Sequence, residues 1–393
     1  MVPQKPFIII VIQRIIVFLR VKSPFMIKKR YLIVLVLLIV ASASFAQQKT
    51  NTADTIRVAS PVLNNTPAAA SNQSSLDIHF NGFAFLDDHE YDALIPLRKT
   101  ISGTRTAIDI GYNLDSLNHF IVGTNALHEF GGVPYFVQIN PVAYYSFQNK
   151  EWLFNAGEFP RDGLLSQMPR GLLNDSVQYY RPNVEGLLLR HTSKFGYETG
   201  FIDWISRQTP TNRNQFMTGE LGTFAPNPGH AFYISHYFLV EHNAGSKSDT
   251  AADIQDSGGG QLRLGLDYSH RTIFDSLKFE VGGMLTAHRT RSEYQFQFSR
   301  GIVSTVYLAI KRFSLLDEFY KGNPSYLTYA DPFYTLKIFN RADFMYTAFL
   351  GKHLKGQFFL GLIQSPARLQ DSEPGFRMVY DIGRKTLARF KED

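Results

Sequence analysis

Long runs in which apolar and polar residues alternate are the feature that most constrains this chain. Leu262, Leu264 and Leu266 alternate with polar or glycine residues, and similar runs recur between residues 76 and 382. Alternation with a period of two places one set of side chains on each face of a β-sheet. Several runs reach about 9–11 residues, the length that a tilted strand needs to cross a bilayer. The sequence therefore predicts an all-β fold whose strands are long enough to span a membrane.

Residues 1–46 carry the three parts of a secretory signal peptide. A basic stretch precedes an apolar core, and Ser44 and Ala46 stand at the −3 and −1 positions before Gln47. This layout predicts cleavage before Gln47. Residues 1–25 then come from a start codon placed too early, or they belong to one long signal peptide. A retained membrane anchor is the alternative, but the apolar core is shorter than the roughly 20 residues of a spanning helix.

Removal of the signal peptide changes what the charge implies. The whole chain has 40 basic and 34 acidic residues, a formal net charge of +6. Residues 1–46 hold seven of the basic residues and no acid, so the rest has 40 − 7 = 33 basic against 34 acidic residues, a net charge of −1. The positive charge thus belongs to the targeting segment, and we expect no nucleic-acid partner.

The residue types favour a membrane barrel. The chain has no cysteine, which excludes disulfides, thiolate metal sites and an N-terminal lipid anchor. Aromatic residues make up 14% of it, yet no stretch after residue 46 is apolar for about 18 residues. Periodicity alone also fits a water-soluble β-sandwich. In a membrane barrel the pattern is inverted, so that Leu262 and Leu264 face lipid and Arg263 faces the lumen.

Three segments follow from these patterns: the signal peptide at 1–46, a disordered polar linker at 47–75 and a barrel at 76–393. Turn-type residues separate the alternating runs, among them Asn81-Gly82 and Glu373-Pro374-Gly375, and residues 246–260 form a longer polar stretch. At roughly 20–22 residues per strand and connection, we expect a transmembrane antiparallel up-and-down β-barrel of about 14–16 strands.

One segment carries a closer likeness to a known family. Trp152-Leu-Phe-Asn-Ala-Gly-Glu-Phe-Pro-Arg161 resembles the strand of phosphate-selective (O/P-type) porins in which a Gly-x-Phe element leads toward the pore loop. The alternating region as a whole is similar to Gram-negative outer-membrane porins. Such barrels usually end on an aromatic residue, whereas here three charged residues follow Phe390.

The resemblance implies a function and a location. It implies a channel for passive diffusion of small polar or anionic solutes, in the outer membrane of a Gram-negative bacterium. The implied partners are outer-membrane lipid, these solutes and the outer-membrane assembly machinery. Many porins are homo-oligomers, and the oligomeric state stays open.

Residues 160–185 lack the alternation and contain three prolines. An irregular segment longer than about 15 residues in a compact domain is usually functional. In porins such a segment folds into the lumen, where facing charges select solutes. The candidate constriction residues are the six charged ones, Arg161, Asp162, Arg170, Asp175, Arg181 and Glu185. An extracellular loop with surface ion pairs is the alternative.

Two further polar groups receive a structural interpretation. Asp87-Asp88-His89-Glu90, with Asp92, offers oxygens to Ca²⁺ but lacks the spacing of a known calcium loop, so we expect a solvated turn. Ser235 and His236 are adjacent on a predicted strand and point to opposite faces, so they cannot form a catalytic dyad.

No Gly-x-Ser-x-Gly, His-Glu-x-x-His or phosphate-loop motif is present. The sequence analysis therefore predicts a channel without catalytic residues, metal or cofactor, and not an enzyme. A closed barrel that acts in binding or assembly is the first alternative, and an outer-membrane hydrolase is the second.

Overall fold

The computed structural model consists almost entirely of long antiparallel strands. It describes residues 74–91, 100–246, 254–293, 295–366 and 368–390, which all belong to one compact unit, Asp54–Asp393. The predicted signal peptide and nearly all of the predicted linker lie outside these residues. The first strand begins at Ser74, two residues before the predicted start of the barrel.

The strands are β1 (Ser74–Asp88), β2 (Thr100–Asn113), β3 (Asn118–Glu129), β4 (Gln138–Gln148), β5 (Trp152–Pro160), β6 (Asn183–Ser193), β7 (Gly196–Ser206), β8 (Gln215–Phe224), β9 (Phe232–Asn243), β10 (Gln255–Asp267), β11 (Ser276–Thr290), β12 (Gln297–Ile310), β13 (Phe313–Gly322), β14 (Ile338–Leu350), β15 (Leu354–Ser365), β16 (Arg368–Asp381) and β17 (Lys385–Phe390). Short helical turns lie in three connections: α3 (Ser176–Tyr180), η2 (Arg291–Glu293) and η3 (Pro332–Thr335). Within the described part of the chain, no helix has the length and apolarity to cross a membrane.

The sheet closes on itself. Strands that follow each other along the chain pair antiparallel, and β1 also pairs with β16, where Asn81 lies opposite Asp381. β17 continues β16 along the first part of β1, with Ser74 opposite Phe390. Because β16 and β17 share one place in the wall, the 17 strands form a closed barrel of 16 places. The predicted up-and-down β-barrel of about 14–16 strands is confirmed.

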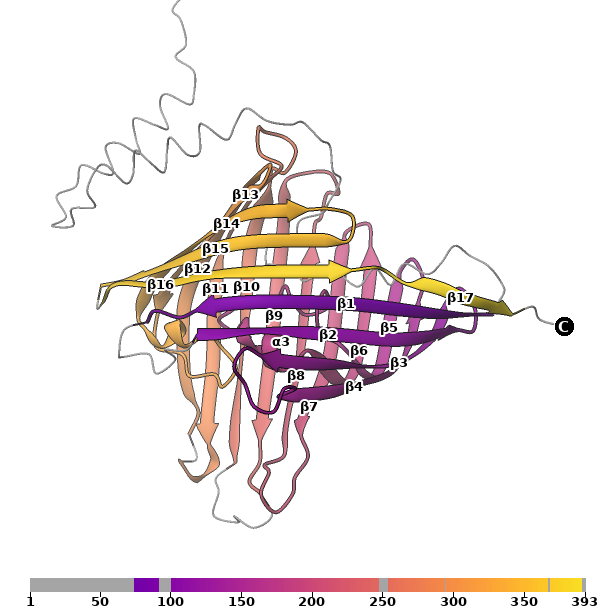
Figure 1. Ribbon diagram of the computed structural model, residues 1–393. Coiled ribbons are helices and arrows are strands. Elements are labelled where there is room, and N and C mark those ends of the chain that lie inside the picture. Colours follow the sequence, from indigo (N-terminus) through magenta and orange to yellow (C-terminus); the bar gives the residue numbers. More distant parts are fainter. Residues whose placement is uncertain (1–73, 92–99, 247–253, 294, 367, 391–393) are drawn as a thin grey trace, which may run out of the picture. The chain divides into compact units, whose positions relative to one another are not determined.

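The strands are steeply tilted. In Figure 1 the strands at the front, such as β1 and β2, run across the direction of β9 to β12 behind them. This crossing is expected of a closed barrel, whose strands tilt by about 35–45° to the barrel axis.

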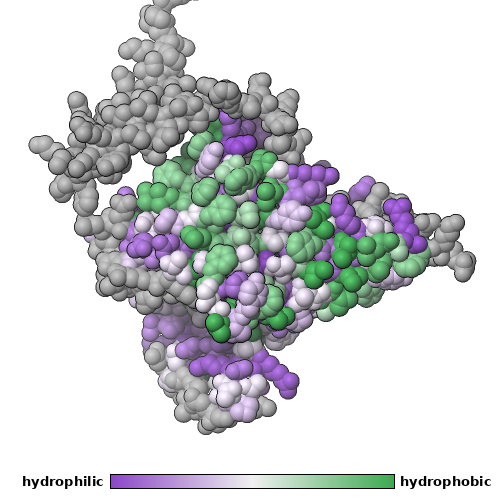
Figure 2. Space-filling view, viewed as in Figure 1, coloured by the Kyte–Doolittle hydropathy of each residue, from purple (hydrophilic) through white to green (hydrophobic). Residues whose placement is uncertain are grey.

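Alternate residues of each strand face the interior and the exterior. On β10, Arg263 is 4% exposed, whereas Leu262 and Leu264 are 60% and 51% exposed. Figure 2 shows hydrophobic residues spread over the visible side of the wall. A water-soluble sandwich would turn its polar residues outward instead. The exterior is therefore the lipid-facing surface, as predicted.

The two ends of the barrel differ in their connections. Where β1 begins, neighbouring strands are joined by tight turns such as residues 194–195 and 311–312. Where β1 ends, the connections include residues 161–182 and 323–337. Outer-membrane barrels have short periplasmic turns and longer extracellular loops. We therefore call the end with the long connections the extracellular end and the other the periplasmic end.

Two predicted turns are wrong because they lie inside strands. Asn81-Gly82 pairs with β2 on one side and with β16 on the other. Glu373-Pro374-Gly375 lies within β16. Pairing with two neighbouring strands outweighs the local turn preference of these residues. Likewise, residues 255–260, expected in a polar loop, form the first part of β10.

Candidate functional site

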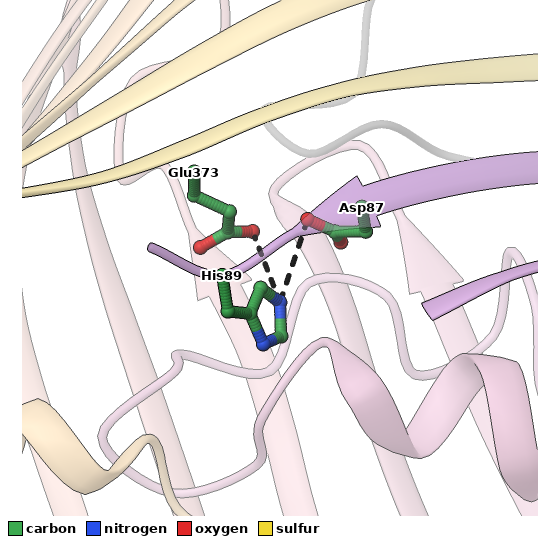
Figure 3. Close-up of side chains that lie close together, drawn as sticks. All are labelled: Asp87, His89 and Glu373. Carbon is green, nitrogen blue, oxygen red and sulfur yellow. Dashed lines mark ion pairs between the residues drawn. The ribbon is translucent and has the colours of Figure 1, made fainter. Parts of the chain in front are cut away.

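The interior near the extracellular end gathers residues from both ends of the chain. After β1 the chain continues beside β16, where the backbones of Glu90 and Ser372 exchange hydrogen bonds of 3.0 and 3.2 Å. Closure of the barrel thus places Glu373 next to Asp87 and His89, as Figure 3 shows. Because Asp87 and His89 are two residues apart, they share the inward face.

The His89 ring lies between two carboxylates. Its Nε2 is 3.4 Å from Asp87 Oδ1 and 3.9 Å from Glu373 Oε1 (Figure 3). The ring stacks on Tyr91, with centroids 4.9 Å apart and an interplanar angle of 6°. The Tyr91 hydroxyl in turn donates to Glu373 Oε2 at 2.7 Å. These contacts fix the orientation of the imidazole.

Two arginines, a buried one and a half-buried one, hold the carboxylates in place. Arg377 Nη2 lies 3.2 Å from Asp87 Oδ2, and Arg341 Nη2 lies 2.8 Å from Glu373 Oε2. The hydroxyl of Tyr179, in α3, also donates to Asp87 Oδ2 at 3.1 Å. Charge-assisted hydrogen bonds of this kind restrict both the position and the orientation of a carboxylate.

The surroundings favour protonation of His89. Burial alone lowers the pKa of His89, but the hydrogen bond with Asp87 and the negative charge of Glu373 raise it more, so that the pKa lies above its ordinary value of 6.5. Burial and the charge of Glu373 raise the pKa of the Tyr91 phenol far above its usual range, so Tyr91 stays a hydrogen-bond donor.

This arrangement suits proton transfer. A histidine oriented by a carboxylate takes a proton from a nucleophile, and the carboxylate stabilises the imidazolium that forms. Since Nε2 of His89 faces the carboxylates, Nδ1 is the atom that remains for this task; the described residues give Nδ1 no hydrogen-bond partner. The three side chains also offer ligand atoms within 4.8 Å of one another, close enough for a divalent cation. The metal-free site expected from the sequence stays a prediction.

A second histidine–carboxylate group lies on the outer wall. His236 Nε2 is 2.9 Å from Glu198 Oε2 and 3.3 Å from Glu220 Oε1, and all three side chains point outward from β7, β8 and β9. Ser235 points inward and is 1% exposed. Ser235 and His236 thus lie on opposite faces, as predicted.

Residues 160–185 were expected to narrow the lumen, and the part of them between β5 and β6, residues 161–182, folds into the barrel interior; we call this part the luminal segment. Leu165, Met168 and Leu172 are at most 2% exposed and pack against inward-facing residues of the wall. The wall residues of this cluster include Tyr144, Phe159, Val184, Leu188, Phe201, Met217, Leu221 and Leu239. The luminal segment is therefore a packed element inside the barrel and not an external loop.

Two of the predicted constriction residues anchor this segment. Arg161 is 1% exposed and pairs with Asp203 of β7; it also donates to the backbone oxygens of Arg181 and Asn183, at 2.9 and 3.1 Å. Arg170 contacts Asp175 at 2.8 Å and, on β14, Asp343 at 2.6 Å. Each guanidinium therefore ties the luminal segment to the barrel wall.

The other predicted residues are divided between inside and outside. Asp175 precedes α3, and Asp162 and Arg181 are half-buried, with Arg181 Nη2 3.2 Å from the Ile205 backbone oxygen. Glu185 is exposed and faces outward from β6, opposite Glu158 of β5. Glu185 was assigned to the wrong side because β6 already begins at Asn183, where the alternation of the strand takes over.

A second connection, residues 323–337, also enters the interior and was not predicted. The backbone amide of Asp331 donates to the Arg170 oxygen at 2.8 Å, and that of Asn174 donates to the Tyr329 oxygen at 2.6 Å. The pocket lined by Arg170, Arg341 and Arg377 holds about 30 Å³. That volume accommodates about one or two water molecules. The two connections thus fill the lumen together at this level.

A protein-family model that matches this chain describes an enzyme, which agrees with a site suited to proton transfer. The model of the lipid A 3'-O-deacylase-type family matches residues 68–358, more than half of the 393 residues. The chain belongs to this family. The prediction that it is not an enzyme is therefore wrong, because the family is described by an enzymatic activity. The matched stretch of this lipid A 3'-O-deacylase-type chain includes Asp87 and His89 and ends before Glu373.

Solved porin structures resemble this lipid A 3'-O-deacylase-type barrel. OpdL of Pseudomonas aeruginosa is 12% identical, with a TM-score of 0.47 over 80% of this chain and 99% of that one. The anion-selective porin of Comamonas acidovorans is 8% identical, with a TM-score of 0.48 over 79% and 100%. OccAB1 of Acinetobacter baumannii is 10% identical, with a TM-score of 0.46 over 83% and 99%. Among curated proteins, none matches the sequence.

The location follows from the barrel itself. Within the described residues, a closed antiparallel barrel carries an apolar exterior, short turns at one end and long connections at the other. Closed barrels of this kind satisfy their backbone hydrogen bonds within lipid, and they are found in outer membranes. The lipid A 3'-O-deacylase-type chain is thus an outer-membrane protein of a Gram-negative bacterium. Contact with the assembly machinery and homo-oligomerisation stay predictions.

Proposed function

We propose that this barrel is an acyl-ester hydrolase that acts on lipid A-type glycolipids in the outer leaflet. The observation that carries the proposal is the His89 ring between Asp87 and Glu373, at the extracellular end of a barrel of this family. Lipid A carries fatty acids in ester linkage, and ester hydrolysis needs a group that takes a proton from water. His89 is placed to be that group.

The reaction needs no covalent intermediate. His89 Nδ1 accepts a proton from a water molecule as the water oxygen attacks the ester carbonyl. The bond between the carbonyl carbon and the glycolipid oxygen then breaks, and the proton passes to that oxygen. The products are a free fatty acid and a glycolipid hydroxyl group. Asp87 and Glu373 orient the ring and stabilise the imidazolium, and Arg377 and Arg341 act as positioning residues for these carboxylates.

Mass spectrometry of lipid A tests this proposal. Cells that produce the barrel should contain lipid A that has lost one acyl chain, whereas cells without it should not. His89→Gln should reduce the conversion by about 100-fold or more, since general base catalysis contributes roughly 10²–10⁴.

The matched control is His79→Gln, because the His79 ring also lies between two carboxylates, with Nδ1 3.0 Å from Asp109 Oδ2 and Nε2 2.9 Å from Asp381 Oδ1, and belongs to neither the His89 cluster nor any proposed lipid site. Both variants should migrate as folded, heat-modifiable barrels. Unchanged lipid A in cells with folded wild-type barrel would contradict the proposal, and so would full activity of His89→Gln.

The channel predicted from the sequence is a second candidate. It is favoured by one observation: the luminal segment lies inside the barrel and brings Arg161 and Arg170 into the lumen. A channel for small polar or anionic solutes should give steady single-channel conductance in a planar bilayer. Replacing Arg170 should then shift the reversal potential in a salt gradient. A barrel that conducts neither with nor without the luminal segment is not a channel, and a role in binding or assembly would then be the remaining non-enzymatic function.

A further inference from the structure

Basic side chains gather on the outward face at the extracellular ends of β9 to β13. We call this set the basic rim; it consists of His242 on β9, Arg289 on β11, Arg291 in η2, Arg300 on β12 and Lys321 on β13. We infer that the basic rim binds the phosphate groups of an outer-leaflet glycolipid whose acyl chains lie against the barrel wall below. This site is separate from the His89 cluster, and the inference does not rest on the proposed function.

The outward direction of the rim follows from strand alternation. The neighbours that point inward are closed off from solvent: Glu241 beside His242 is 3% exposed, and Tyr320 beside Lys321 is 1% exposed. Arg300 shares its face with Ile302, which is 57% exposed. The rim side chains therefore project from the outside of the barrel and not into the lumen.

The rim carries more positive than negative charge. Asp256 on β10 is the carboxylate at its centre, and it contacts Arg289 Nη2 at 2.8 Å, Arg291 Nε at 2.9 Å and His242 Nδ1 at 2.9 Å. One carboxylate thus serves two guanidinium groups and an imidazole. Arg300 adds a further positive charge, and so does Lys321. An outward carboxylate farther from this end, Asp317, accepts a hydrogen bond from Asn340 at 2.8 Å.

The level of the rim matches the boundary of the membrane. Toward the periplasmic end, the same outward faces carry apolar side chains such as Leu285 and Phe238, 57% and 50% exposed. At the rim itself, the Arg289 guanidinium lies 4.4 Å from the centre of the Phe296 ring, and the rings of His242 and Phe216 are 5.1 Å apart. Aromatic girdles of this kind mark the interface between lipid and water on outer-membrane barrels.

The chemistry of the rim selects the ligand. A lipid with phosphate groups on its headgroup presents negative charge just above its acyl chains, which is the spacing between the basic rim and the apolar wall. Guanidinium groups bind phosphate oxygens with paired hydrogen bonds. Arg289 and Arg291 share the single carboxylate of Asp256, so each guanidinium has N–H groups left that can bind a phosphate while the contact with Asp256 is kept. Since the rim lies at the extracellular end, the lipid is the phosphorylated glycolipid of the outer leaflet.

Binding of lipopolysaccharide to the purified full-length barrel in detergent tests the inference. The rim variant combines Arg289→Gln, Arg291→Gln and Arg300→Gln. The control variant removes three exposed basic residues in the turns at the periplasmic end, Arg271→Gln, Lys311→Gln and Arg312→Gln. Each cation near an anionic lipid surface strengthens binding by roughly fivefold. We expect the rim variant to bind about 10- to 100-fold more weakly than the wild type, and the control variant to stay within about twofold.

Two ligand controls separate the sources of phosphate. Dephosphorylated lipopolysaccharide should bind the wild type as weakly as intact lipopolysaccharide binds the rim variant, and millimolar inorganic phosphate should not displace the glycolipid. Equal binding by the rim and control variants would overturn the inference, as would displacement by inorganic phosphate. If the rim variant does not fold, Arg300→Gln alone should weaken binding about fivefold. The measured quantity is glycolipid binding and not ester hydrolysis, so failure of the hydrolase proposal leaves this test intact.

Discussion

Arg161 offers a test of whether the luminal segment is held by a buried charge pair or left free to screen solutes. Arg161→Met removes the partner of Asp203, which is 0% exposed and would keep one hydrogen bond, from the Glu185 backbone amide at 3.0 Å. Removal of one member of a buried pair costs about 3–5 kcal/mol, because the other charge stays buried without compensation. We therefore expect Arg161→Met to lower the free energy of unfolding by about 3–5 kcal/mol.

The double variant makes this reasoning sharper. Arg161→Met with Asp203→Asn removes both charges and keeps a side-chain oxygen that can accept from the Glu185 backbone amide, so only the backbone oxygens of Arg181 and Asn183 lose their donor. At about 1 kcal/mol for each lost hydrogen bond, the double variant should lose about 2 kcal/mol and be more stable than Arg161→Met alone.

Urea unfolding of the barrel in phospholipid vesicles measures these differences. Arg207→Met, at an exposed arginine just after β7, is the control and should change the free energy of unfolding by no more than about 0.5 kcal/mol. A loss below about 1 kcal/mol for Arg161→Met, or a double variant less stable than the single one, would refute the anchoring role of the pair.

Three further predictions follow from particular contacts. Because only the neutral imidazole accepts a proton and the pKa of His89 lies above 6.5, the deacylation rate should rise as the pH passes through that pKa. Since Asp87 helps to raise this pKa, Asp87→Asn should move the midpoint of the pH–rate profile to lower pH. A Cβ at Gly222 would lie 2.5 Å from Glu198 Oε2 and 2.8 Å from the Tyr197 backbone oxygen, whereas a Cβ at Gly200 would meet nothing within 4 Å. In urea unfolding, Gly222→Ala should therefore lower the free energy of unfolding by about 1–3 kcal/mol, and Gly200→Ala should change it little. Leu264→Arg puts a charge on the lipid-facing wall, where a charged side chain costs about 2–4 kcal/mol near the midplane. It should therefore lower the yield of heat-modifiable barrel far more than Gln295→Arg, which lies outside the strands. Equal yields of the two variants would count against the assigned faces.

The wall of the barrel could be predicted from the sequence because it depends on local alternation. Leu262 and Leu264 face outward and Arg263 inward, as their pattern indicates. Asn81-Gly82 could not be assigned in the same way, since its place inside β1 depends on pairing with β2 and β16. The prediction that Glu185 faces the lumen is wrong because the sequence alone does not locate the start of β6 to within two residues.

The candidate site was harder to predict because it joins the two ends of the chain. The local sequence predicts a solvated turn at Asp87 and His89, whereas closure of the barrel buries Asp87 against Arg377 and brings Glu373 beside it. The closing pair of β1 and β16 was implied by an up-and-down barrel, so the residues at their ends could have been compared directly. Known catalytic motifs could not indicate the site, because this chain contains none of those considered although it belongs to an enzyme family.

The most direct measurement of the central claim is whether an oxygen atom of water enters the released fatty acid. Purified, folded barrel is incubated with lipid A in water enriched in ¹⁸O, and the released fatty acids are analysed by mass spectrometry. Hydrolysis with His89 as the base predicts free fatty acid with one ¹⁸O atom in its carboxyl group, at a rate that falls by about 100-fold or more in His89→Gln. If the folded wild-type barrel releases no labelled fatty acid, or if His89→Gln releases it at the same rate, the assignment of this site is contradicted.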